Sequence, residues 1–192
     1  SFSPLSSAIF VSTSYGCSNL YPNVTLDWAA VSGNNGYLYQ YDTVPTFNSP
    51  GLVTGNSGLN SSQFTVSDLR FGTTYYWRAA VLTTSDTSMW STTWSFTTLD
   101  AVTNLAPTNG SSLFSTSPDL DWVGFTGNQG YLYELDTTPS FNSPLLRAGN
   151  SGLNSSIVTV TELEYGRTWY WRAAHVNNVD TSGWGPTWTF DT

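Results

Sequence analysis

Polar and apolar residues alternate with a period of two along much of this 192-residue chain. The clearest run is 74–80, Thr-Tyr-Tyr-Trp-Arg-Ala-Ala, in which alternation puts Tyr75, Trp77 and Ala79 on one face. Aromatic residues at this density have a high strand propensity. No stretch of the sequence follows the period of an amphipathic helix. The pattern therefore predicts an all-β protein in which one face of each strand is buried.

The run at 74–80 returns 94 residues later, at 168–174, as Thr-Trp-Tyr-Trp-Arg-Ala-Ala. The same shift aligns most of the remaining sequence, so the chain contains two copies of one unit. Each copy has short apolar runs at roughly ten-residue spacing, separated by Gly- and Asn-rich turns, which is typical of an antiparallel β-sandwich. We expect an N-terminal arm at 1–9, a sandwich at 10–98, a short linker at 99–103 and a second sandwich at 104–192.

One segment of the first unit interrupts the alternation. Residues 43–50 contain two prolines, which do not fit a central strand, so we interpret this segment as a loop. Phe47 lies in the middle of the loop, and we expect its ring to plug the core. The alternating runs predict strands near 24–28, 37–42, 51–54, 64–66, 74–80 and 90–96.

Charge and composition narrow the classes of partner. The formal net charge of −8 and the pI of about 4.1 would repel a phosphate backbone, so no nucleic-acid partner is expected. No run approaches the roughly 18 apolar residues that a membrane helix needs, so no membrane span is expected. Only 9% of the residues are charged, and a surface rich in Ser, Thr, Asn and Gly is typical of extracellular proteins. We therefore expect the protein at the cell surface or in a matrix.

Several aromatic and glycine positions resemble those of fibronectin type III domains, most of all the tandem copies in bacterial secreted and surface proteins. The resemblance covers both units and is carried by Trp28, Tyr37, Leu69, Gly72, Tyr75, Trp77 and Trp90. It implies that the hydroxyl of Tyr75 bonds back to the backbone at a corner of the sandwich. The second unit has Trp169 there, so indole packing must take its place. The resemblance also implies a spacer, adhesive or structural module.

The residues that could carry chemistry fit structural roles better than catalytic ones. His175 is the only histidine, and its counterpart in the first unit is Val81, which argues against a catalytic triad. Aspartate in turns usually bonds to its own backbone, so we expect no enzyme and no cofactor. Calcium is the alternative, although no Asp-x-Asp-x-Asp-Gly loop is present. The calcium candidates are Asp42, Asp86, Asp136 and Asp180.

Two kinds of glycan contact are possible from the sequence. Trp90 and Trp184 lie beside turns, where an exposed indole could stack on a sugar ring, and burial in the core is the competing interpretation. Four sequons could accept a glycan in a suitable host, at Asn23, Asn60, Asn109 and Asn154. The loop at 55–62 is also copied without change at 149–156, which indicates either a shared binding surface or a recent duplication.

The N-terminal arm resembles the end of the first unit. Residues 1–5, Ser-Phe-Ser-Pro-Leu, align with 95–99, Ser-Phe-Thr-Thr-Leu, and share three identities. The match can arise by chance, can mean that the chain was cut from a longer array, or can mean that the arm adds as a strand to a neighbouring molecule. In the last case the arm would use Phe2, Leu5 and Ile9.

The only cysteine, Cys17, has two interpretations as well. It replaces the serine found at position 111 of the second unit, and it could form a disulfide between molecules if they join head to tail. A small buried thiol is the alternative.

These patterns favour a non-enzymatic extracellular structural protein. The expected partners are copies of the chain itself, joined head to tail into a filament by the arm. The alternative is a carbohydrate-binding or adhesion module of a larger secreted protein, with glycans as the partner.

Overall fold

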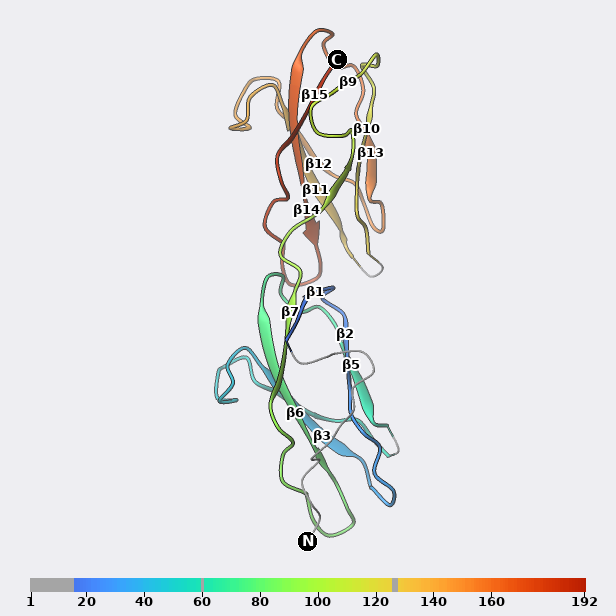
Figure 1. Ribbon diagram of the computed structural model, residues 1–192, viewed down its shortest axis with the longest axis vertical. Coiled ribbons are helices and arrows are strands. Elements are labelled where there is room, and N and C mark those ends of the chain that lie inside the picture. The colour runs from blue at the N-terminus through green and yellow to red at the C-terminus, as the bar shows by residue number, and fades with distance from the viewer. Residues whose placement is uncertain (1–15, 60, 126–127) are drawn as a thin grey trace. The chain divides into compact units, whose positions relative to one another are not determined.

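The computed structural model describes residues 16–59, 61–125 and 128–192 (Figure 1). All of the regular elements in these ranges are β-strands, which confirms the all-β prediction. The chain divides into two compact units, Ser1–Leu99 and Asp100–Thr192. The proposed arm residues Phe2, Leu5 and Ile9 lie outside the described residues. Among the described residues, no helix is long and apolar enough to cross a membrane.

The first unit is a sandwich of two sheets. In the larger sheet the strand order is β1-β7-β6-β3-β4, with β1 parallel to β7 and the other pairs antiparallel. Its strands are β1 (Cys17–Leu20), β7 (Trp94–Thr98), β6 (Thr74–Val81), β3 (Tyr37–Asp42) and β4 (Val53–Asn56). The smaller sheet pairs β2 (Val24–Asp27) with β5 (Gln63–Val66).

The second unit repeats this arrangement. Its larger sheet has the order β12-β11-β14-β15-β9, and its smaller sheet has the order β13-β10-β8. The larger sheet contains β12 (Arg147–Asn150), β11 (Gly130–Asp136), β14 (Thr168–Val176), β15 (Trp188–Asp191) and β9 (Ser111–Ser112). The smaller sheet contains β13 (Ile157–Thr159), β10 (Asp119–Trp122) and β8 (Asn104–Ala106). Each unit is therefore a β-sandwich, as the alternation predicted, and its strand pairs are antiparallel except for β1 with β7 and β9 with β15.

A cluster of large aromatic rings fills the core of each unit. In the first unit, the ring centroids of Trp28 lie 5.6 Å from Tyr37 and 6.3 Å from Trp77. The second unit repeats the cluster with Trp122, Tyr131 and Trp171, at 5.5 and 6.4 Å. Removing a buried ring of this size costs about 3 to 5 kcal/mol, because the cavity does not close fully. These tryptophans therefore contribute much of the stability of each sandwich.

The segment expected to be a linker belongs largely to the second unit. Val102 is buried in the core of that unit, and Ala101 forms a β-bridge with Gly183. A Cβ atom on Gly185 would lie 2.6 Å from the carbonyl oxygen of Val102, so the two backbones approach too closely for a side chain.

The two units hold their corner turn by different means. In the first unit, the backbone N–H of Arg70 donates to the hydroxyl of Tyr75 at 3.0 Å, which is the bond that the resemblance implied. In the second unit, the corresponding Trp169 is buried. There Arg147 donates to the carbonyl oxygens of Thr161 and Glu162 and fastens the turn from the edge strand β12. The tyrosine therefore fastens the first turn by accepting from an N–H, and the arginine fastens the second turn by donating to two carbonyl oxygens.

This exchange predicts two unit-specific losses of stability. Tyr75→Phe leaves the Arg70 N–H without its acceptor, and Arg147→Val frees two carbonyl oxygens, so each should lower the free energy of unfolding of its own unit by about 1 kcal/mol. Hydrogen exchange measured by mass spectrometry distinguishes the two units in the full chain. Tyr165→Phe, at an exposed tyrosine, is the control and should change neither unit. Equal losses in both units would contradict the assignment.

Candidate functional site

A three-layer stack of phenylalanine, arginine and tryptophan lies on the outer face of the larger sheet of each unit. In the first unit, the guanidinium carbon of Arg78 lies 4.0 Å from the ring centroid of Phe47 and 4.8 Å from that of Trp90. Arg78 follows Trp77 on β6, and successive side chains on a strand point to opposite faces. Because Trp77 is buried in the core, the stack covers the other face.

The second unit builds the same stack from the corresponding residues. The guanidinium carbon of Arg172 lies 4.1 Å from the Phe141 ring and 4.6 Å from the Trp184 ring. The Nε and Nη2 nitrogens of Arg172 both contact Oε2 of Glu134, at 2.8 and 2.6 Å. In the first unit Gln40 takes the place of Glu134 and accepts from Arg78 at 2.9 and 2.7 Å. Gln40 or Glu134 therefore bonds to the edge of each guanidinium group, and cation–π contacts hold its two faces between the rings.

Phe47 is buried, as predicted, but its ring packs under Arg78 and does not belong to the aromatic core cluster. Its backbone has a φ of 52°, and Phe141 has the same value. A bulky residue rarely adopts this left-handed conformation, so other contacts must hold the loop in place.

A buried aspartate holds that loop. The carboxylate of Asp42 accepts from the Thr43 N–H at 2.6 Å and from the Ser49 N–H at 3.1 Å, and the Ser49 hydroxyl also donates to it. Burial acts to raise the pKa of Asp42, but the bonds from Ser49 and Thr43 outweigh it and keep the pKa below its ordinary value. The carboxylate therefore stays charged and closes the loop around Phe47.

Asp136 does the same in the second unit. It is buried, and it accepts from the N–H of Thr137 at 2.6 Å and from the N–H of Ser143 at 2.9 Å. As with Asp42, burial acts to raise its pKa and the hydrogen bonds lower it below the ordinary value. Two of the four calcium candidates thus direct their oxygens to donors of the protein itself.

The other two calcium candidates lie in the turns after β6 and β14. Asp86 accepts from the N–H of Thr87 at 2.8 Å, and Asp180 accepts from the N–H of Thr181 at 2.9 Å. Across 16–59, 61–125 and 128–192, no three His, Cys, Asp or Glu side chains gather where they could hold a metal. The structure does not bring the four aspartates together.

The stack also limits how much of the Trp90 and Trp184 rings is available to a sugar. Trp90 and Trp184 are each half-buried, with one face of the indole toward an arginine. Only the remaining face and edge could meet a sugar. The arginine fixes the ring, so a ligand would lose little side-chain entropy in ordering it.

The sequence interpretation missed the arginine and phenylalanine of the stack. A signal was present, because Arg78 and Arg172 occupy the same position in both copies, as do Phe47 and Phe141. What the sequence lacked was any indication that the loop folds back over β6.

Hydrogen bonds explain most of the loop that is copied at 55–62 and 149–156. In the second copy, Asn150 accepts from the Gly152 N–H at 2.8 Å, and Ser155 donates to the Ile157 carbonyl at 2.9 Å. The first copy makes the same two bonds at 2.8 and 3.0 Å. A Cβ atom on Gly149 would lie 2.8 Å from the hydroxyl oxygen of Tyr133, so glycine is required there. The loop conformation thus restricts its sequence in both units.

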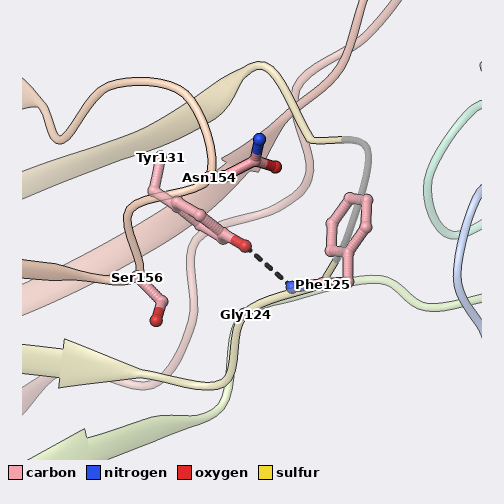
Figure 2. A pocket seen from close by; sticks show the side chains of 5 residues that line it. All are labelled: Gly124, Phe125, Tyr131, Asn154 and Ser156. Carbon is pink, nitrogen blue, oxygen red and sulfur yellow. Dashed lines mark hydrogen bonds between the residues drawn. The ribbon is translucent and has the colours of Figure 1, made fainter.

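A cavity of about 340 Å³ opens beside this loop in the second unit. Figure 2 shows its lining, with the hydroxyl of Tyr131 accepting from the Phe125 N–H at 2.9 Å. The lining offers aromatic faces, hydroxyls and one amide, which can bind a polar ligand but include no acid and base pair. The residues that line it are Gly124, Phe125, Tyr131, Asn154 and Ser156.

His175 lies behind two of these aromatic residues. Its ring centroid is 5.2 Å from Phe125 and 5.3 Å from Tyr131, and its side chain is buried. Burial lowers the pKa of His175 from 6.5 to about 4, so the imidazole is neutral at physiological pH. This environment is that of a core residue.

The remaining candidates are placed as follows. Cys17 is partly buried and packs against the core of the first unit. Of the sequon residues, Asn60 lies outside the described residues, and the other three are exposed. The Asn109 side chain accepts from the Thr189 N–H at 2.9 Å, and the Asn23 side chain accepts from the Asp68 N–H at 3.2 Å.

Comparisons with known proteins give matches only among solved structures. No family model matches the chain, and no curated protein does. The FN1–FN3 domains of chicken CNTN1 match with 12% identity and a TM-score of 0.37, over 96% of this chain and 67% of that one. A segment of two fibronectin type III domains from chicken tenascin matches with 14% identity and a TM-score of 0.45, over 91% of this chain and 94% of that one.

The two units are fibronectin type III-like sandwiches. The strand order within each unit carries this assignment, because both copies pair a larger sheet containing β3 and β6, or β11 and β14, with a smaller one built on β2 or β10.

The low pKa of His175 predicts a pH-dependent loss of stability in the second unit. Between pH 6.5 and pH 4 the unfolded chain binds a proton that the folded chain excludes, so this contribution is complete above pH 6.5 and is lost as the pH falls toward 4. At 1.36 kcal/mol per pKa unit, the loss at pH 4.5 should be roughly 2 to 3 kcal/mol.

The variant His175→Val, which copies Val81 of the first unit, should lack this loss. Urea unfolding at pH 7 and pH 4.5, with hydrogen exchange in β14 as the readout, measures it. Asp42 and Asp136 are present in the original chain and in the variant, so their contribution cancels when the two pH-dependent losses of stability are subtracted. An equal loss in the variant would show that His175 is not the titrating group.

Proposed function

We propose that the protein is a non-enzymatic extracellular structural protein, a subunit that joins copies of itself head to tail into a filament of the cell surface or matrix. The fold suits a structural or adhesion module. The burial of the reactive side chains supports the proposal, since Asp42, Asp136 and His175 all lie inside the units. No cofactor is needed for this function, and no nucleic acid is expected as a partner at a net charge of −8.

The observation that carries the assembly proposal is the match between the arm, 1–5, and the segment 95–99. In the first unit that segment pairs with β6 on one side and with β1 on the other. After it, the Leu99 N–H donates to the carbonyl oxygen of Leu20 at 2.7 Å. A sequence of this type therefore forms strands in this protein. The arm would use the same pairing on a neighbouring molecule, with Phe2, Leu5 and Ile9 as its apolar side chains.

Deletion of residues 1–9 tests the assembly. The full chain should form filaments that are visible by electron microscopy and sediment rapidly, because a head-to-tail contact that does not close into a ring adds one molecule after another. The shortened chain should stay monomeric and keep the unfolding transition of its second unit. Filaments of equal length in both samples, or monomers in both, would contradict the proposal.

A carbohydrate-binding or adhesion module is the second candidate function. It is favoured by the repeated stack, which holds Trp90 and Trp184 in the same orientation relative to an arginine in each unit. Two fixed indoles on one chain could bind a repeating glycan at two points.

A glycan array distinguishes the second candidate. Under that function the full chain binds a glycan class, and Trp90→Ala together with Trp184→Ala removes the binding, since each indole supplies the stacking surface. Met89→Ala, at an exposed residue next to Trp90, is the control and should bind as before. Binding that survives the double substitution would place the glycan elsewhere.

A further inference from the structure

The stacks of the two units differ at the residue that bonds to the arginine. Gln40 accepts from Nε and Nη2 of Arg78 in the first unit, and Glu134 takes its place in the second. The Gln40 amide is itself oriented, because its nitrogen donates to the Thr54 hydroxyl at 3.1 Å. In the second unit, Ala148 stands at the position of Thr54. The neutral partner and the residue that orients it are therefore both specific to the first unit.

The guanidinium group of the first stack has no acidic partner. Arg78 is half-buried, and burial lowers its pKa below the ordinary value. Asp42 lies on the same face of β3, but its carboxylate accepts from N–H groups of the loop that follows it. In the second unit, Glu134 forms an ion pair with Arg172. In the part of the chain that the structure describes, Arg78 forms no such pair, so its charge is not cancelled.

Part of the Arg78 fork also remains available to a ligand. A guanidinium group has five N–H donors, and Gln40 takes one from Nε and one from Nη2. Phe47 and Trp90 cover its two faces. Within 16–59, 61–125 and 128–192, no group accepts a hydrogen bond from Nη1. The end of the fork, formed by Nη1 and Nη2, therefore keeps donors in the arrangement that a carboxylate accepts from with both of its oxygens.

Trp90 places an apolar ring beside these donors. One face of its half-buried indole lies on Arg78, which leaves the other face to stack on a sugar ring. A ligand that contacts both groups needs an apolar ring face and a carboxylate. A sugar acid has both on one six-membered ring.

The charges of the two units favour the first stack for such a ligand. The first unit, 1–99, has four acidic residues and two arginines, whereas the second, 100–192, has nine acidic residues and three arginines. Repulsion of an anion is therefore concentrated in the second unit. A ligand with a single carboxylate meets only a weak net charge in the first.

We propose that the stack of the first unit binds a sugar acid, with its carboxylate on the end of the Arg78 fork and its ring on Trp90. The inference rests on the second candidate function, carbohydrate binding, and does not depend on the filament. It names the ligand class of one stack and distinguishes that stack from the other. In the second unit Glu134 cancels the charge of the arginine, so the stack there has no preference for an acidic sugar over a neutral one.

A titration of the full chain followed by NMR tests the preference. The ligands are methyl glucuronide and methyl glucoside, which differ only in having a carboxylate or a CH2OH group at one carbon. The indole N–H signals of Trp90 and Trp184 report on the two stacks, and Trp90→Phe and Trp184→Phe identify them. At Trp90 the glucuronide should bind about tenfold more tightly, as one hydrogen bond between charged groups provides, and added salt should reduce the preference. At Trp184 the two sugars should bind alike.

Exchange of residues between the units tests the cause of the preference. Gln40→Glu copies the second unit and should remove the preference at Trp90. Gln63→Glu adds the same charge on β5, in the other sheet, and is the control that should keep it. Glu134→Gln combined with Ala148→Thr should give Trp184 the preference. Each exchange copies a residue of the sister unit, and hydrogen exchange checks that the variants keep the fold.

Three results would overturn the inference. Equal binding of the two sugars at Trp90 would remove the acid and leave carbohydrate binding in place. A preference that is unchanged in Gln40→Glu would show that the charge of Arg78 is not its cause. The same shift of the Trp90 signal with acetate alone, at equal concentration and affinity, would indicate a site for a small anion only. If neither sugar shifts either indole signal, the inference and the carbohydrate function both fail, and the filament proposal is unaffected.

Discussion

Each unit depends on one strand, β6 or β14, whose two faces carry different interactions. Trp77 points into the core of the first unit, and the next residue, Arg78, points outward into the stack. The strand is thus packed on both faces, which an antiparallel sheet with one solvated face does not require. The contact between Arg78 and Phe47 holds the loop between β3 and β4 against the outer face of the sheet. Core packing and loop position are therefore coupled through neighbouring residues on one strand.

The loop that Arg78 covers stores strain that the surrounding bonds must offset. A left-handed backbone at Phe47 costs of order 1 to 3 kcal/mol. A partly desolvated cation–π contact returns about 1 to 2 kcal/mol, and bonds to a charged carboxylate are stronger than neutral ones. Asp42 supplies those bonds from within the sandwich. This explains why the aspartate, the phenylalanine and the arginine all recur at the 94-residue shift.

The alternation of the sequence predicted strands well and predicted loops poorly, for a physical reason. The expected strand at 37–42 has the bounds of β3. The expected strand at 74–80 ends one residue before β6 does, at Ala80 instead of Val81. Alternation reports which side of a strand is buried, and it carries no information on where a loop folds. The position of Phe47 depends on Arg78, which is far away in the sequence, so the ring was assigned to the wrong face. The strand β9 was not predicted because its two serines show no apolar pattern, and its parallel pairing with β15 alone defines it.

The copied loop illustrates the limit of reading function from repetition. Its asparagine and serine side chains bond to the loop's own backbone, and a side chain in place of its first glycine would collide with a tyrosine ring, so these residues have a role in the fold itself. Leu59 and Leu153 are different, because both are 63% exposed and neither belongs to a core cluster. Repetition at a residue that the fold constrains says little about function. The same repetition at an exposed leucine has no explanation in the packing of its own unit, and a recent duplication accounts for it as well as a shared binding surface does.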